Sequence, residues 1–227
     1  TLLVPELGRG MGTGHIRRCL ALLNELPDSY LLISRADSAR RGPEELAPLL
    51  EGVSNDRIVA DASGEWERVV IDRFSVTADE VQGFGEAFTI GIDVGGIGRE
   101  FCSYLIDMFP RVDDASANII DAGLIPVPES VAVPTEAAGC FLVSFGGEDP
   151  ALLTEKVVAA LTDAGVSPER ITVVAPALRQ LGELPAHVIK SEPVESLWPL
   201  MANHEWVVCG FGLTAYEAAG MGRAVVV

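Results

Sequence analysis

The chain opens with Leu2-Leu3-Val4, a short apolar run, and continues through Gly8-Arg9-Gly10-Met11-Gly12-Thr13-Gly14-His15 into a stretch with helical periodicity. Apolar residues recur there at the spacing of one helix face, which predicts a helix packed on a sheet through Ile16, Cys19, Leu20, Leu23 and Leu26. The opposite face carries His15, Arg18 and Leu22. A strand, a glycine-rich turn and a helix in this order predict the start of a parallel α/β domain.

The same alternation of strand and helix signals runs through both halves of the chain. The β-rich runs are Leu2–Val4, Tyr30–Ser34, Val69–Asp72, Thr89–Asp93 and Tyr104–Ile106, then Cys140–Ser144, Ile171–Ala175, Val188–Ile189, Trp206–Cys209 and Ala224–Val227. In the second half an apolar stripe over 153–164 predicts one helix, and Ser196–Asn203 predicts a shorter one with Pro199 near its first turn. The predicted fold class is α/β with parallel sheets.

The segment Ile125–Thr135 contains three prolines, which favour an extended connection over regular structure. We therefore expect two domains, over residues 1–130 and 136–227. The chain stops on Ala-Val-Val-Val, a run typical of a central buried strand with nothing after it to complete the sheet. On this pattern we expect the second domain to lack its C-terminal end.

Composition and charge argue against several classes of protein. The 227 residues carry a formal net charge of −17, so a broad nucleic-acid surface, which relies on clustered Lys and Arg, is not expected. No apolar run reaches the roughly 20 residues of a membrane span, and the first residues lack the features of a signal peptide. The four cysteines, Cys19, Cys102, Cys140 and Cys209, occur singly, as is typical of buried thiols in a reducing compartment. We expect a soluble cytoplasmic protein.

The first glycine-rich turn is a candidate ligand site. Gly10, Gly12, Thr13 and Gly14 lie at the start of the helix, where bare backbone, free N–H groups and partial positive charge suit an anion or a sugar ring. Such a turn also joins a strand to a helix in the absence of any ligand. His15 favours the functional interpretation, because an imidazole near a positive helix end favours its neutral form and can act as a general base.

Arg18 lies one turn after His15 on the same helix face. It can bind a carboxylate, a phosphate or the partner domain, and the alternative is a solvated arginine. The sequence leaves these alternatives open.

A second glycine-rich turn follows a strand of the second half, at Cys209-Gly210-Phe211-Gly212-Leu213-Thr214-Ala215-Tyr216-Glu217. Gly212, Leu213 and Thr214 would present a helix N-terminus to a pyrophosphate, and Glu217 would accept hydrogen bonds from both ribose hydroxyls. The alternative is a capping box, since Thr214 and Glu217 have its T-x-x-E spacing.

A third candidate loop, Ser144-Phe145-Gly146-Gly147-Glu148-Asp149, follows the first strand of the second half. Ligands of open parallel sheets collect at the carboxyl ends of the strands, where all three loops fall. Ser144, Gly146, Gly147 and Asp149 are therefore candidate ligand contacts. Asp72 and Asp93 also end strands and would line the site in the first domain, although loop or cap roles are more usual for such residues.

Taken together, these motifs resemble those of a known family. Gly12–Arg18, Ser144–Asp149 and Gly212–Glu217 are similar to segments of the UDP-sugar hydrolases of pseudaminic acid biosynthesis, in the GT-B glycosyltransferase superfamily. The last segment also resembles the N-acetylglucosaminyl transferase of peptidoglycan synthesis. The resemblance implies two Rossmann-like domains facing a cleft, with UDP held by the second and the sugar reaching the first.

The resemblance also implies a chemistry. His15 would take the place of the general base, with Arg18 beside it, and water would attack the anomeric carbon and expel UDP with inversion. It implies a UDP-sugar as the partner and neither a cofactor nor a metal. Where the family has Asp-His-Tyr this chain has Asp72-Arg73-Phe74, and Asp93-Val94-Gly95-Gly96 replaces a paired-acid segment, so the particular sugar stays open. A glycosyltransferase using a hydroxyl acceptor and a noncatalytic nucleotide-sugar binding protein are the alternatives.

Overall fold

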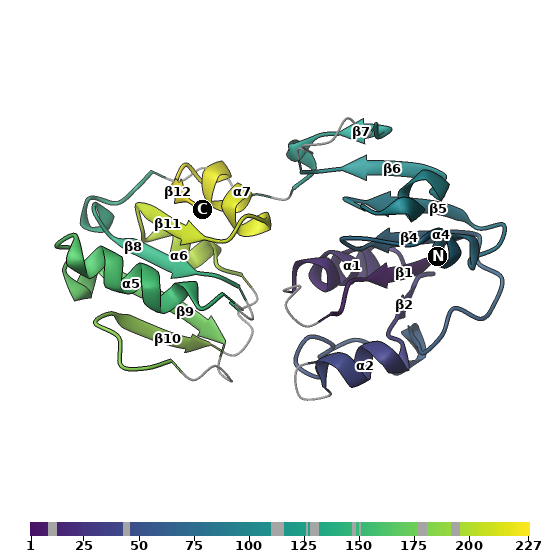
Figure 1. Cartoon of the computed structure of the whole chain (residues 1–227), viewed down its shortest axis with the longest axis horizontal. Coiled ribbons are helices and arrows are strands. Elements are labelled where there is room, and N and C mark those ends of the chain that lie inside the picture. Colours follow the sequence, from purple (N-terminus) through teal and green to yellow (C-terminus); the bar gives the residue numbers. More distant parts are fainter. Residues whose placement is uncertain are drawn as a thin grey trace. The chain divides into compact units, whose positions relative to one another are not determined.

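The structure is a computed structural model, and it describes residues 1–8, 13–42, 46–109, 116–125, 127, 132–146, 149, 151–176, 181–191 and 196–227. The chain divides into two compact units, Thr1–Leu124 and Ile125–Val227. Each unit contains one parallel sheet flanked by helices (Figure 1). The chain is therefore α/β with two Rossmann-like units, and the division between them falls at the start of the proline-rich segment.

The first unit contains a seven-stranded sheet in the order β3-β2-β1-β4-β5-β6-β7. Its elements are β1 (Leu2–Pro5), α1 (Gly14–Glu25), β2 (Tyr30–Leu32), α2 (Arg35–Arg41), η1 (Asn55–Arg57), β3 (Ile58–Val59), β4 (Arg68–Asp72), α4 (Ala78–Gln82), β5 (Phe88–Ile92), η2 (Ile97–Phe101), β6 (Tyr104–Asp107), β7 (Ile119–Ile120) and η3 (Ala122–Leu124). From β1 the chain adds β2 and β3 on one side, and then returns to add β4, β5, β6 and β7 on the other side of β1. The carboxyl ends of β1 and β4 therefore flank a topological switch point, where ligands of such sheets bind.

Alternating side chains of the strands build a core on each face of this sheet. On one face, Leu3 and Val70 pack against Ile16, Cys19 and other residues of α1. On the other face, Leu2, Val69 and Ile71 pack in a cluster with Val81 of α4. Burial on both faces explains why the strands read as continuous apolar runs in the sequence.

The second unit contains a five-stranded parallel sheet in the order β10-β9-β8-β11-β12, which repeats the arrangement of the first five strands of unit 1. Its elements are η4 (Thr135–Ala137), β8 (Phe141–Ser144), α5 (Leu153–Asp163), η5 (Pro168–Arg170), β9 (Ile171–Pro176), β10 (His187–Ser191), α6 (Trp198–Ala202), β11 (Trp206–Cys209), α7 (Leu213–Gly220) and β12 (Ala224–Val226). One face packs against α5, and the other packs against α6 and α7. Here the switch point lies between β8 and β11.

Several expectations from the sequence need correction. Leu22, expected on the polar face of α1, packs against the core, and Leu26 is exposed. Cys19 and Cys209 are buried, but Cys102 and Cys140 are only half-buried. The amphipathic pattern predicts helices correctly but not the width of the face that each one buries.

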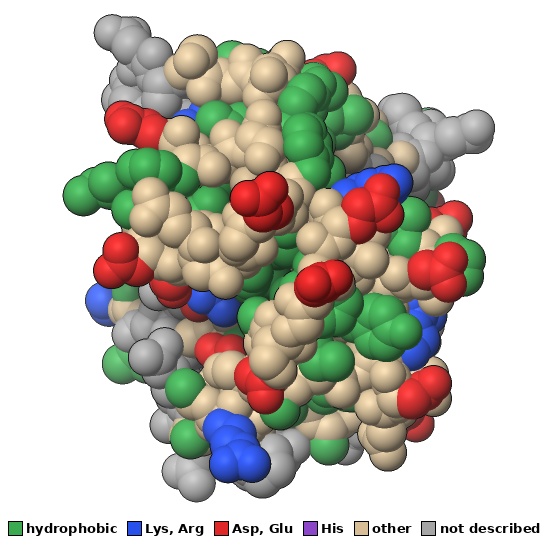
Figure 2. All heavy atoms as spheres, turned by 90° about the vertical axis from the view of Figure 1, so that its right-hand side faces the viewer, with side chains coloured by type: hydrophobic (Ala, Val, Ile, Leu, Met, Phe, Trp, Pro, Cys, Tyr) green, Lys and Arg blue, Asp and Glu red, His purple; other side chains and the backbone are tan. Residues whose placement is uncertain are grey.

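Acidic side chains are spread over the face of the molecule shown in Figure 2, with hydrophobic and basic side chains between them. This distribution agrees with the excess of acidic over basic residues in the sequence. Among the helices that the structure describes, none is long and apolar enough to cross a membrane.

His204 joins two elements of the second unit in its uncharged form. Its Nδ1–H donates to the carbonyl of Leu200 in α6 at 2.7 Å, and its Nε2 lies 2.9 Å from the hydroxyl of Thr172 in β9. Burial lowers the pKa of His204, although the hydrogen bond to Leu200 opposes this shift. The unfolded chain therefore binds a proton more readily at this residue than the folded unit does.

We predict that His204 makes unit 2 less stable in acid. Because the pKa is lower in the folded state, stability is complete above the unfolded value of about 6.5 and falls as the pH drops through it. In His204→Asn this residue no longer titrates. Thermal denaturation of the full chain between pH 7.5 and 5 should show a larger loss of Tm in the wild type than in the variant. Equal losses would rule out the contribution of His204.

Candidate active site

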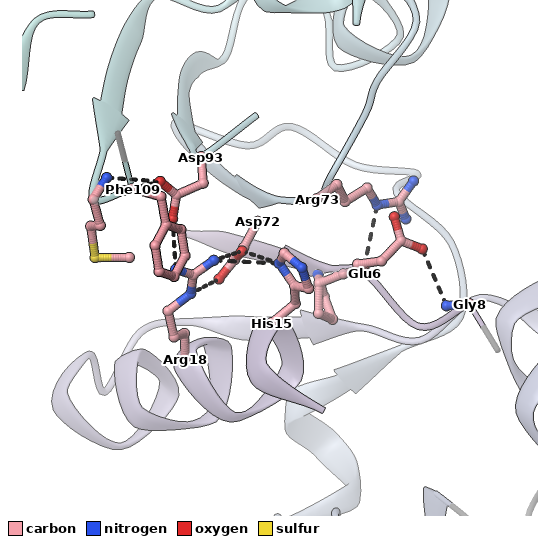
Figure 3. A network of polar contacts seen from close by, with 10 residues as sticks. Glu6, Gly8, His15, Arg18, Asp72, Arg73, Asp93 and Phe109 are labelled. Carbon is pink, nitrogen blue, oxygen red and sulfur yellow. Dashed lines mark hydrogen bonds and ion pairs between the residues drawn. The ribbon is translucent and has the colours of Figure 1, made fainter. Parts of the chain in front are cut away.

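Three strand ends meet at the switch point of unit 1. Asp72, the last residue of β4, pairs with Pro5 of β1 on one side and with Ile92 of β5 on the other. Asp93 directly follows β5, and α1 begins beyond the end of β1. The first turns of α1 therefore lie beside the carboxyl ends of β4 and β5, and Figure 3 shows His15 and Arg18 reaching from α1 toward the two aspartates.

His15 and Asp72 form a buried pair. The Nδ1 atom of His15 lies 2.5 Å from Oδ1 of Asp72, whose side chain is 0% exposed. Because a carboxylate only accepts hydrogen bonds, Nδ1 carries a proton, and whenever the ring is uncharged its lone pair is on Nε2. Within the described part of the chain, no hydrogen bond to Nε2 is found. The edge-on ring of Phe74 lies 4.3 Å from the imidazole centroid and supports its orientation.

Arg18 binds both aspartates. Its Nε and Nη2 donate to the two oxygens of Asp72 at 2.7 and 2.5 Å, and its Nη1 donates to Oδ2 of Asp93 at 2.7 Å. The guanidinium carbon also lies 5.8 Å from the centre of the Phe109 ring, within cation–π range. Burial, the largest single influence, acts to lower the pKa of Arg18, but the hydrogen bonds and charges of Asp72 and Asp93 together raise it. Arg18 is therefore a permanent cation.

Asp93 is held in an uncommon backbone conformation. Its φ is 52°, in the left-handed region, and its Oδ1 accepts hydrogen bonds from the N–H groups of Met108 and Phe109 at 2.7 and 3.0 Å. The following turn depends on Gly96, where a Cβ would lie 2.4 Å from the Ser75 hydroxyl and 2.7 Å from the Val76 carbonyl. The loop after β5 is thus built to present the Asp93 carboxylate to Arg18.

The loop and cap roles that the sequence alone favours for the two aspartates are therefore incomplete. Asp72 is buried and binds side chains of α1, and Asp93 combines a backbone role with an ion pair to Arg18. Among the alternatives that the sequence leaves open for Arg18, the structure shows binding to carboxylates, and these are the side chains of Asp72 and Asp93 in the same unit. The cluster can accept a proton at Nε2 of His15 and contains one permanent cation.

The two candidate loops of unit 2 flank its switch point. Ser144 at the end of β8 pairs with Cys209 at the end of β11, so the chain leaves the sheet at neighbouring positions. Gly146 has a φ of 74°, a conformation that favours glycine. A Cβ built at Gly146, Gly210 or Gly212 would meet no atom within 4 Å, so both loops border open space.

The helices after these loops differ at their N-termini. The carboxylate of Asp149 accepts hydrogen bonds from the N–H groups of Leu153 and Thr154, at 2.8 and 2.9 Å, so it caps α5. Helix α7 begins at Leu213, and its N-cap residue, Gly212, has no side chain that could cap it. Thr214 lies inside the helix, which is not the position of a capping-box residue, so the capping alternative is wrong. The N-terminus of α7 is the more accessible of the two to an anion.

Glu217 lies one turn into α7 and is half-buried. Burial, followed by the negative charge of Glu217, raises the pKa of the Cys209 thiol to about 11. The carboxylate of Glu217 therefore lies close to the end of β11, beside the switch point.

The remaining candidates divide as follows. Thr13 and Gly14 are the N-cap and first residue of α1, whereas Gly10, Gly12 and Gly147 lie outside the described residues. Phe74 and Phe109 were not candidates from the sequence. Phe74 lies two residues after Asp72, so its position close to the site could have been predicted from the sequence. Phe109 follows β6, and its contact with Arg18 depends on the fold of the loop after that strand. In the described ranges, no group of three or more His, Cys, Asp or Glu residues is arranged to bind a metal ion.

Comparison with known proteins adds no assignment, because neither a protein-family model nor a curated protein matches this chain.

We predict that Asp72→Asn destabilises unit 1 strongly. The substitution leaves Arg18 without its two-point partner, and breaking a buried ion pair typically costs about 3 kcal/mol. Asp28→Asn, at an exposed aspartate of the same unit, should change stability by less than about 0.5 kcal/mol. Urea unfolding of the full chain measures both. Equal and small effects of the two substitutions would show that Asp72 is not essential to the packing of α1 on the sheet.

Proposed function

We propose that this protein hydrolyses a nucleotide-activated sugar, with a UDP-sugar as the substrate class that its motifs favour. The observation that carries the proposal is the His15–Asp72 pair at the switch point of unit 1. A carboxylate on Nδ1 fixes the ring and its tautomer and leaves Nε2 to accept a proton, which is the arrangement of a general base.

In the proposed reaction, Nε2 of His15 takes a proton from a water molecule as the water oxygen attacks the anomeric carbon of the sugar. The bond between that carbon and the pyrophosphate oxygen breaks, and UDP leaves with the bonding electron pair. The configuration at the anomeric carbon inverts because attack and departure occur on opposite faces. The proton then passes from His15 to solvent, and the free sugar and UDP are the products.

Unit 2 supplies the proposed nucleotide site, as the resemblance to GT-B proteins implies. The N-cap residue of α7 is Gly212, which supplies no side-chain cap, and N–H groups at a helix N-terminus bind phosphate well. Asp149 occupies the corresponding groups of α5, which favours α7 as the pyrophosphate site. In this proposal Glu217 accepts hydrogen bonds from the ribose hydroxyls. Backbone donors of this kind neutralise a departing pyrophosphate without a metal ion.

The GT-B organisation itself belongs to this proposal. In it the second domain binds the nucleotide and the first supplies the base. A glycosyltransferase would use the same base on a hydroxyl acceptor, and a binding protein would have no use for the base.

We predict that His15→Asn separates binding from turnover. The asparagine amide can still donate to Asp72 but is too weakly basic to accept a proton from water, so nucleotide release should slow by about 10² to 10⁴-fold. UDP affinity, measured by calorimetry, should stay within about twofold. Release is measured on the full chain with a panel of UDP-, GDP- and CMP-sugars, with and without hydroxyl acceptors.

Glu217→Ala is the matched control, because it should weaken UDP binding while leaving the base intact. Normal turnover in His15→Asn would remove His15 from the mechanism. Release by the wild type only when an acceptor is present would identify a transferase, and binding without release would identify a binding protein.

A further inference from the structure

The buried carboxylate of Asp72 has two potential cations beside it. Its side chain is 0% exposed, and a buried carboxylate requires a nearby positive charge. The guanidinium of Arg18 and the imidazole of His15 both lie 2.5 Å from its Oδ1. If the imidazole supplied the charge, both of its nitrogens would carry protons and it could not act as a base.

The geometry favours Arg18 as the cation. It binds both oxygens of Asp72 from one planar group, whereas His15 reaches only one of them. Paired N–H donors of this kind make the strongest ion pairs with carboxylates, and a guanidinium does not lose its proton in proteins.

The surrounding charges show what would follow from the loss of Arg18. From the described elements around the imidazole, Asp72 belongs to β4, Asp93 follows β5, and Glu6 and Arg73 follow β1 and β4 (Figure 3). Arg73 is occupied by the carbonyl of Pro5 and the carboxylate of Glu80, each at 3.3 Å. Within the described part of the chain, loss of Arg18 would leave Asp72 and Asp93 without a bound guanidinium, and the imidazole of His15 would be the group beside Asp72 able to become a cation.

We propose that Arg18 is a positioning residue that serves as the permanent counter-ion of Asp72, and that its charge keeps His15 uncharged at neutral pH. Asp93 holds Arg18 in place through Nη1. The use of the uncharged imidazole as a base rests on the proposed function, but the charge arrangement does not. The role of Arg18 is thus distinct from substrate binding.

The ¹⁵N resonances of His15 in the full chain test this role without any substrate. In the wild type at pH 7.5, one ring nitrogen should be protonated and the other not. In Arg18→Met the pH at which the signals change should move up by about one unit or more, so that about half of the rings or more carry both protons at pH 7.5. Arg18→Lys keeps the charge and should restore the wild-type spectrum. His15→Asn assigns the signals.

Two further variants control for misfolding and for the loss of a positive charge elsewhere in the unit. Arg18→Gln lacks the charge but keeps a donor toward Asp72, so it replaces Arg18→Met if that variant does not fold. Arg68→Met removes an exposed cation from the other end of β4, and it should leave the His15 signals unchanged.

The inference would be overturned if the signals of His15 in folded Arg18→Gln or Arg18→Met changed at the same pH as in the wild type, with one ring nitrogen still unprotonated at pH 7.5. Nucleotide release gives the independent comparison. If the resonances change as expected but the wild type cleaves no nucleotide-sugar, the proposed function fails and the role of Arg18 stands. If the wild type cleaves the substrate and the resonances do not change, the role of Arg18 fails and the proposed function stands.

Discussion

The complete burial of the Asp72 carboxylate is the constraint on which the site depends. A charge removed from water must be compensated by partners with good geometry, and here the partners come from α1. Asp72 can therefore be accommodated only if β1, β4 and α1 are packed in register. The hydrogen bond from Nδ1 of His15 to Asp72 also fixes the imidazole ring. Its Nε2 has no protein partner among the described residues. The interaction that stabilises the packing of α1 also holds the imidazole in the orientation that the proposed function requires.

The order of the strands explains why each unit has one candidate site. In both sheets the chain builds outward in one direction and then returns to the first strand, so two neighbouring strands send their connections apart. In unit 1 these are β1 and β4, where His15 and Asp72 meet. In unit 2 they are β8 and β11, whose following loops border open space. The two sites differ in chemistry: a buried charged cluster lies in the first, and a helix N-terminus with glycine as its N-cap residue lies in the second.

Much of the fold could be predicted from the sequence because its strands are continuous apolar runs separated by glycine turns and helical stripes. The ten expected strands are found, with boundaries that differ from the expected ones by at most two residues. Helices α2 and α4 and strands β3 and β7 were not predicted, because they are short and their apolar patterns are weak.

The candidate site was predictable only in part. His15 and Arg18 follow from their place after a glycine-rich turn, because helix spacing is local information. Their pairing with Asp72 and Asp93 depends on which strands are neighbours, and strand order is not local. Asp149 illustrates the same limit: its role as a cap of α5 depends on a left-handed turn at Asp149 and Leu152 that no residue type there signals.

Oxygen-18 water identifies the bond that breaks. If His15 activates water for attack at the anomeric carbon, UDP released from a UDP-sugar in H₂¹⁸O retains its original oxygens and shows no mass increase. Attack at phosphorus would place one ¹⁸O atom in the nucleotide product. Mass spectrometry of the UDP formed in a single turnover by the full chain distinguishes these outcomes. Unlabelled UDP is the predicted result, and UDP heavier by one ¹⁸O atom would contradict the mechanism.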